Sequence, residues 1–77
     1  MNDIVLPELG EGITDATVAC WHVEPGTEVQ QDEDIVEVVT DKASFNIPSP
    51  MAGIIQEICV GPGEKVEVGS VLARVKR

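Results

Sequence analysis

The sequence predicts an all-β domain, folded as a flattened barrel or sandwich of two small sheets. Three observations carry this prediction. Valine supplies 12 of the 77 residues, and β-branched side chains favour the pleated strand. Proline and glycine recur so often that no stretch between them has the length or the 3.6-residue apolar period of a normal helix. The two halves of the chain also resemble each other.

Each expected strand is an apolar, valine-rich run that ends at a turn former. The run Ile4-Val5-Leu6 stops at Pro7, and the next run stops before Pro25-Gly26. Proline sets φ for the second position of such a turn, and glycine takes the following position, where φ is positive. In chain order, the expected strands are residues 2–6, 17–23, 34–40, 43–48, 53–60 and 70–75, with short pieces near 28–30 and 65–67.

An internal repeat indicates how these strands assemble. Sliding the sequence by 37 residues aligns residues 23–29 with residues 60–66, and both segments read V-x-P-G-x-x-V. We therefore interpret residues 1–77 as one domain with a pseudo-repeat, roughly 1–39 and 40–77. Because each half is too small to bury its own apolar face, the halves are expected to pack about an approximate two-fold axis.

Size and charge restrict the function. A chain of 77 residues buries only ~60% of its unfolded surface, which leaves little room for an enzyme's pocket and supporting residues. The sequence also offers no convergent acid, base and nucleophile, so we expect no catalytic residues and no enzyme activity from the domain alone. Fourteen acidic against five basic residues give a net charge of −9. Such a surface repels nucleic acid and anionic membranes and suits a basic protein partner.

The cysteines and the histidine carry no predicted site. The spacing of Cys20 and Cys59 matches no metal-binding pattern, so we expect free, part-buried thiols in a reducing compartment. A zinc site is not expected, because the single His22 has no second ligand motif. Trp21 is expected to be half-buried, and His22 to lie on the surface without a ligand partner.

Lys42 differs from the other two lysines in its position. It lies near the middle of the chain, between two strand patterns. The link Thr40-Asp41-Lys42-Ala43 contains no Gly or Asn, which favours a four-residue loop around a type I turn over a two-residue primed turn. Asp41 and Lys42 are therefore expected at the tip of a hairpin, pointing into water. On position alone, this tip could be a polar turn and nothing more.

The segment Thr40-Asp41-Lys42-Ala43-Ser44 resembles the attachment motif of lipoyl domains, the carrier modules of 2-oxoacid dehydrogenase complexes. Three further blocks resemble the family in order and spacing, and together the four blocks cover essentially the whole chain. These are Leu6-Pro7-Glu8-Leu9-Gly10-Glu11-Gly12-Ile13, Trp21-His22-Val23-Glu24-Pro25-Gly26-Thr27-Glu28-Val29 and Ile47-Pro48-Ser49-Pro50-Met51-Ala52-Gly53.

The resemblance implies two four-stranded antiparallel sheets with quasi-two-fold symmetry, and lipoic acid in amide linkage on Lys42. Asp41 and Ala43 would flank this swinging arm as part of the recognised tip. The residues Glu11 and Ile13, in the loop after the first strand, would contact the decarboxylase.

The resemblance also implies a set of partner enzymes. A lipoate ligase or lipoyl transferase would attach the cofactor, and a thiamine-diphosphate-dependent 2-oxoacid decarboxylase would reductively acylate it. The acyltransferase catalytic domain would pass the acyl group to coenzyme A, and dihydrolipoamide dehydrogenase would reoxidise the dithiol. The domain itself is expected to be a monomer, part of a dihydrolipoamide acyltransferase.

Alternative interpretations remain open from the sequence. A biotinyl carrier shares the fold, but its attachment lysine lies between two methionines, whereas Asp41 and Ala43 flank Lys42. The lipoylated carrier of the glycine cleavage system is longer and has added helices. An unmodified acidic interaction module is the alternative from a different class. No signal or transit pattern opens the sequence, which favours a cytoplasmic location, or the mitochondrial matrix in a eukaryote.

Overall fold

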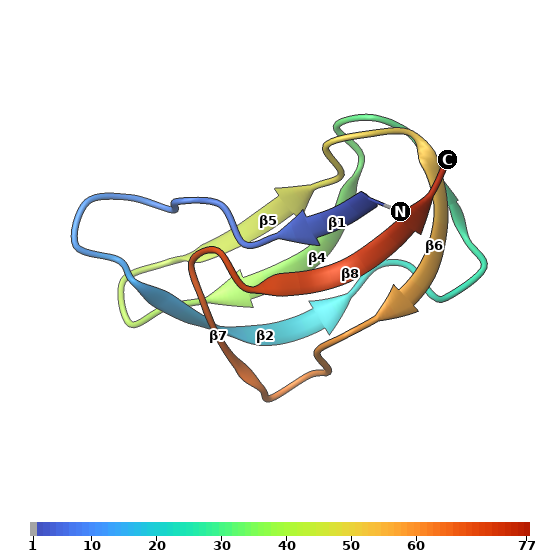
Figure 1. Cartoon of the computed structure of the whole chain (residues 1–77). Coiled ribbons are helices and arrows are strands. Elements are labelled where there is room, and N and C mark those ends of the chain that lie inside the picture. The colour runs from blue at the N-terminus through green and yellow to red at the C-terminus, as the bar shows by residue number, and fades with distance from the viewer. Residues whose placement is uncertain (1) are drawn as a thin grey trace.

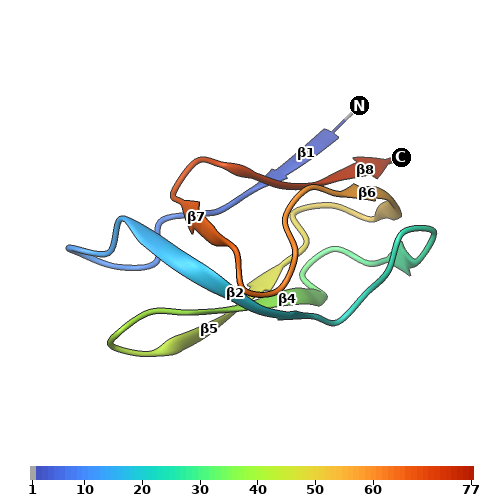
Figure 2. The same cartoon turned by 90° about the horizontal axis from the view of Figure 1, so that it is seen from below.

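Two four-stranded antiparallel sheets form the domain, as expected (Figures 1 and 2). The computed structural model describes residues 2–77. One sheet has the strand order β1-β8-β6-β3 and the other the order β5-β4-β2-β7. Residues 2–77 contain no helix of the length and apolar character needed to cross a membrane. In chain order the strands are β1 (Asn2–Val5), β2 (Asp15–Trp21), β3 (Glu28–Val29), β4 (Asp34–Val39), β5 (Ser44–Pro48), β6 (Gly53–Ile58), β7 (Lys65–Glu67) and β8 (Val71–Lys76).

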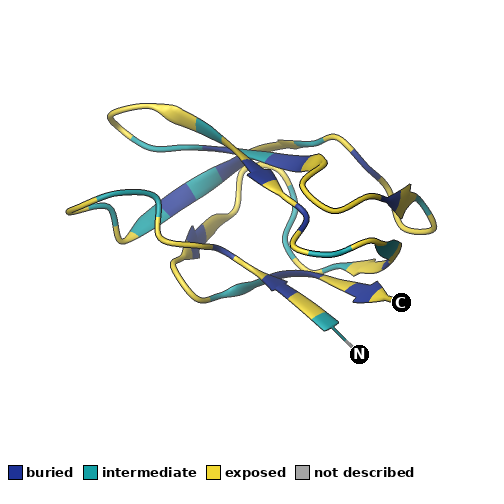
Figure 3. Cartoon of the chain, turned by 90° about the horizontal axis from the view of Figure 1, so that it is seen from above, coloured by how far each residue is buried: buried dark blue, intermediate teal, exposed yellow. Residues whose placement is uncertain are grey.

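The core lies between the two sheets and is built from the inward-facing residues of the strands. Successive side chains of a strand point to opposite faces, so more and less buried residues alternate along β1, β3, β5 and β7, and along parts of the other strands (Figure 3). Leu9, Trp21, Phe45, Met51, Ile58 and Val60 pack against this core from its margin. The buried apolar residues are Ile4, Leu6, Ala16, Val18, Val23, Val29, Ile35, Val36, Val38, Ile47, Ile55, Val66, Leu72, Ala73 and Val75.

The strand registers repeat with the sequence offset of 37 residues. Cys20 pairs with Glu37 between β2 and β4, and Glu57 pairs with Arg74 between β6 and β8. In each pair of strands the register shifts once, just before Cys20 and just before Glu57. The quasi-two-fold symmetry of the fold therefore extends to its β-bulges, where one extra residue is inserted into a strand.

The β4–β5 hairpin and the chain ends are related by the same symmetry. Val38 pairs with Phe45 within the hairpin, and its repeat counterpart Val75 pairs with Asn2 of β1. The N- and C-termini therefore lie at one end of the molecule and the hairpin loop at the other (Figure 1).

The second and sixth strands are shorter at their C-terminal ends than predicted. The runs predicted at 17–23 and 53–60 end at Trp21 and Ile58. Val23 is still buried, but it lies in the turn after β2. Trp21 is half-buried, as expected, and its Nε1 donates a hydrogen bond to the Val60 carbonyl at 2.8 Å. Apolar side chains in a turn can thus reach the core without extending a strand.

The prediction of part-buried thiols is wrong. Both cysteines are free, but both are exposed. The bulges give the physical reason. Ala16 and Val18 of β2 point inward, and an unbroken strand would also point Cys20 inward. The register shift between Val18 and Cys20 instead turns Cys20 to the outer face, and an equivalent shift precedes Cys59.

Candidate functional site

The candidate site is the loop that joins β4 to β5. Strand β4 ends at Val39 and β5 begins at Ser44, which confirms the predicted four-residue loop. Asp41 and Lys42 are exposed at its tip, at the end of the molecule away from the termini (Figure 1). The two strands pair as far as Val39 and Ser44, so the loop is rooted directly in the sheet.

Thr40 closes the loop through its hydroxyl group. Its Oγ1 accepts hydrogen bonds from the backbone N–H groups of Lys42 and Ala43, each at 3.1 Å. Across the base of the loop, Thr40 N donates to the Ala43 carbonyl at 2.8 Å, and Thr40 Oγ1 donates to the same carbonyl at 3.0 Å. In a type I turn, the Ala43 N–H would donate its hydrogen bond to the Thr40 carbonyl. Here it donates to the Thr40 side-chain oxygen.

Thr40 was not predicted to be part of the site. A usable signal was present, because serine and threonine hydroxyls often bond to backbone groups two or three residues further along the chain. These contacts hold the backbone on which Lys42 is mounted, while the lysine side chain itself extends into solvent.

Replacing Thr40 with valine is expected to loosen this loop. Thr40→Val keeps the side-chain shape but removes the hydroxyl, which should lower the free energy of unfolding by about 1 kcal/mol. The amide protons of Lys42 and Ala43 should exchange faster with solvent, as measured by NMR hydrogen exchange. Thr14→Val is the matched control, because the Thr14 hydroxyl makes no hydrogen bond within residues 2–77. Equal effects of the two changes would contradict the bracing role of Thr40.

The ε-amine of Lys42 is free. It forms no ion pair or hydrogen bond with any part of the chain that the structure describes. Lys65, by contrast, pairs with Asp15 at 3.5 Å between Nζ and Oδ2. Of these two lysines, Lys42 therefore offers the amine that a partner reaches without breaking an existing contact.

A groove connects the Lys42 loop to the loop after β1. Gly12, Ile13 and Thr14 line it from one side, and Thr40, Asp41 and Lys42 line it from the other. The two loops lie side by side at the same end of the molecule (Figures 1 and 2). The loop after β1 therefore lies beside the Lys42 loop.

The loop after β1 is anchored at both of its ends. Leu6 N donates to the Ser70 carbonyl at 2.9 Å, and Val68 N donates to the Thr14 carbonyl at 3.0 Å. Ile13 N donates to the Gly10 carbonyl at 3.1 Å, which makes a turn at the tip of the loop. Ile13 is partly exposed and lines the groove; Glu11 is exposed and lies outside it.

Comparison with known proteins gives the family. The family profile described as "Biotin-requiring enzyme" matches residues 2–75. The solution structure of the lipoyl domain of the 2-oxoglutarate dehydrogenase complex from Azotobacter vinelandii is 38% identical, with a TM-score of 0.77, and the match covers 100% of this chain and 98% of that one. The chain belongs to the lipoyl-domain family.

The relatives of this lipoyl domain are acyltransferase components of 2-oxoacid dehydrogenase complexes. The dihydrolipoyllysine-residue acetyltransferase component of the pyruvate dehydrogenase complex from Corynebacterium glutamicum is 45% identical over 74 residues, which are 96% of this chain and 11% of that protein. The succinyltransferase component of the 2-oxoglutarate dehydrogenase complex from Bartonella vinsonii is 43% identical, over 97% of this chain and 18% of that protein. The chain thus matches only the small lipoyl part of each relative.

A second group of side chains lies elsewhere on this lipoyl domain. His22 is on the surface, as expected, and it has polar neighbours that the sequence did not indicate. Its Nε2 lies 3.0 Å from Asn46 Oδ1, and one ligand atom from each of Cys20, His22 and Glu37 lies within 4.8 Å of the others. The β2 bulge turns Cys20 toward Glu37, and the sequence pattern does not reveal a bulge.

Proposed function

We propose that this lipoyl domain carries lipoic acid in amide linkage on Lys42. The observation that carries the proposal is the free, exposed amine of Lys42 at a braced hairpin tip, in a chain of this family. Asp41 and Ala43 flank the lysine as part of the surface that the attaching enzyme recognises. A rigid sheet fixes where the arm begins, and the flexible side chain gives it reach and a high local concentration at its partners.

The domain supplies presentation and recognition, and the cofactor supplies the chemistry. When bound, lipoic acid offers a dithiolane that accepts an acyl group together with two electrons. We propose that the domain presents this group in turn to three enzymes: a thiamine-diphosphate-dependent 2-oxoacid decarboxylase, an acyltransferase that uses coenzyme A, and dihydrolipoamide dehydrogenase. Association of the similar lipoyl domains with 2-oxoacid dehydrogenase complexes supports this sequence of partners.

Intact-mass spectrometry tests the attachment directly. After incubation with a lipoate ligase, ATP and lipoic acid, the chain should gain one lipoyl amide, and peptide mapping should place it on Lys42. Lys65→Arg and Lys76→Arg are matched controls that should be modified like the original chain. A parallel incubation with biotin and a biotin ligase should give no adduct. A biotin adduct would favour a biotinyl carrier, and no adduct in either reaction would favour an unmodified interaction module.

We further propose that Glu11 and Ile13 contact the decarboxylase. Both belong to the loop beside the Lys42 tip, so an enzyme that receives the arm meets this loop as well. Ile13→Ala and Glu11→Gln should lower the rate of reductive acylation about tenfold, as expected for the loss of about 1.4 kcal/mol of contact energy. Both variants should still be lipoylated at the original rate.

A panel of purified decarboxylases, specific for pyruvate, 2-oxoglutarate or branched-chain oxoacids, is the readout for these two variants. Glu24→Gln, an exposed change in the turn after β2, is the matched control. The panel also identifies the complex that the domain serves, since the fastest enzyme marks its partner. Unchanged acylation of both loop variants by that enzyme would remove Glu11 and Ile13 from the interface.

A further inference from the structure

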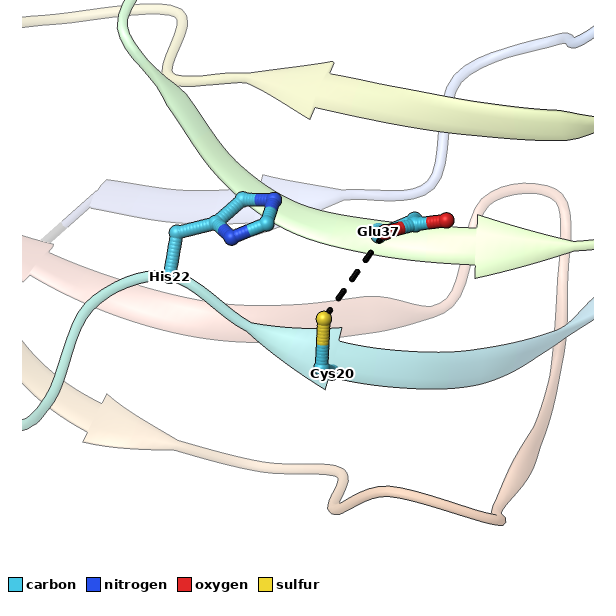
Figure 4. A group of neighbouring side chains, drawn as sticks. All are labelled: Cys20, His22 and Glu37. Carbon is cyan, nitrogen blue, oxygen red and sulfur yellow. Dashed lines mark hydrogen bonds between the residues drawn. The ribbon is translucent and has the colours of Figure 1, made fainter.

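The outer face of the β5-β4-β2-β7 sheet carries a cluster of three chemically different ligand groups. Cys20 and His22 come from β2 and the residue after it, and Glu37 comes from β4 (Figure 4). Cys20 Sγ lies 3.8 Å from Glu37 Oε1, to which the thiol donates a weak hydrogen bond. One ligand atom from each of the three side chains lies within 4.8 Å of the other two.

The β2 bulge creates this cluster. In a strand, residues i and i+2 lie on the same face. The register shift that turns Cys20 outward therefore places His22 on the outer face as well, while Trp21 between them packs against the core. Glu37 is the residue directly opposite Cys20 in the β2–β4 pairing, and side chains at such positions are neighbours.

The symmetry-related half shows that the fold does not require these residues. The counterparts of Cys20 and Glu37 are Glu57 and Arg74, which form an ion pair at 3.5 Å. At the 37-residue offset, the counterpart of His22 is Cys59. An ion pair occupies the equivalent position in that half, so the fold forms there without a Cys–His–Glu set. The set occurs in one half alone.

The donor set and spacing fit zinc. A thiolate, an imidazole nitrogen and a carboxylate are the protein ligands that Zn²⁺ prefers, in tetrahedral geometry. Zn–S and Zn–O bonds of about 2.3 and 2.1 Å at the tetrahedral angle place the sulfur and oxygen about 3.6 Å apart. The observed distance between Cys20 Sγ and Glu37 Oε1 is 3.8 Å, so these two groups need little movement to share an ion.

Asn46 supplies the outer contact that such sites have. A histidine that binds a metal through one ring nitrogen donates a hydrogen bond from the other. His22 Nε2 lies 3.0 Å from Asn46 Oδ1, and Asn46 is the β5 residue opposite Glu37. With Nε2–H donated to Asn46, Nδ1 keeps the lone pair for a metal. We propose that Cys20, His22 and Glu37 bind one Zn²⁺ ion, with water in the fourth position.

Isothermal titration with zinc chloride, on the full chain with its thiols kept reduced by a non-chelating phosphine, tests this proposal. We expect one Zn²⁺ per chain and an unchanged monomer mass by light scattering. Cys20→Ser and His22→Ala should each weaken binding at least tenfold, and Asn46→Ala about tenfold through the outer contact. All three residues are exposed, so the variants should keep the circular dichroism spectrum of the original chain.

Cys59→Ser is the matched control, because Cys59 is also a free, exposed thiol. It should leave the affinity unchanged. Co²⁺ gives a second readout: thiolate-to-cobalt charge-transfer absorption should appear in the original chain and in Cys59→Ser, and be absent in Cys20→Ser. Binding of half an ion per chain, equal losses in the two cysteine variants, or no saturable binding would each overturn the proposal. Lipoylation of Lys42 is measured separately, so neither result depends on the other.

Discussion

The double variant K42A/A43K, which moves the lysine one position along the β4–β5 loop, is expected to lose lipoylation. The amine count and the net charge stay the same, so only the position of the amine changes. Ala43 lies at the base of the loop, where its N–H and carbonyl both bond to Thr40. A side chain mounted there leaves the hairpin in a different direction from that of Lys42.

The expected size of this effect follows from geometry. A misplacement of about 1 Å in a reacting group can lower an enzymatic rate about a hundredfold, and a shift of one residue displaces the amine further than that. Intact mass after a timed incubation with lipoate ligase measures the loss. Lys42→Ala gives the background, and thermal unfolding confirms that the double variant is folded. Modification of K42A/A43K at the original rate would contradict the proposal that the ligase recognises the position of Lys42.

The substitution Gly53→Ala is expected to destabilise the domain more than any other single methyl addition to its glycines. A Cβ at Gly53 would lie 2.5 Å from Val75 Cγ1 and 2.7 Å from the Lys76 carbonyl oxygen. The second contact is with backbone of a central strand, which cannot move without disturbing the sheet. Overpacking of this kind costs about 3 kcal/mol, from a total stability of about 4–12 kcal/mol for a chain of this size.

Urea denaturation measures this loss, and the midpoint of thermal unfolding should fall by about 15 °C. Gly61→Ala is the matched control. A Cβ added at Gly61 would have Glu64 Oε2 as its nearest neighbour, at 3.4 Å, and this atom is the end of a flexible side chain. It should change the stability by no more than about 0.5 kcal/mol, in either direction. A loss of equal size at both glycines would contradict the close approach of Gly53 to β8 as the cause.

Much of the fold could be predicted because local sequence signals and the fold agree. The V-x-P-G-x-x-V turns and the 37-residue offset indicated two similar halves, and the strand registers follow the same offset. The four-residue loop was predicted from the absence of Gly and Asn in residues 40–43, which disfavours a two-residue primed turn. Strand ends were less accurate, because the burial of Val23 resembles that of a strand residue although it lies in a turn.

The features that were missed depend on contacts between distant strands. The exposure of Cys20 results from a one-residue bulge in β2, and no residue type marks that bulge. Cys20 and Glu37 are 17 residues apart in sequence. They lie close together because of the register in which β2 pairs with β4. The role of Thr40 is local and could have been predicted. Periodicity thus predicts which face a residue occupies only as long as the strand is unbroken.

The position of the chain ends has a consequence for how the domain works within a larger assembly. Both termini lie at the pole opposite the Lys42 loop (Figure 1). Any polypeptide joined at either end would leave from that pole, so a covalently attached neighbour would not obstruct an enzyme that docks over the lysine. The 33 Å long axis of the body would then act as a rigid spacer, carrying the reactive end clear of whatever anchors the domain.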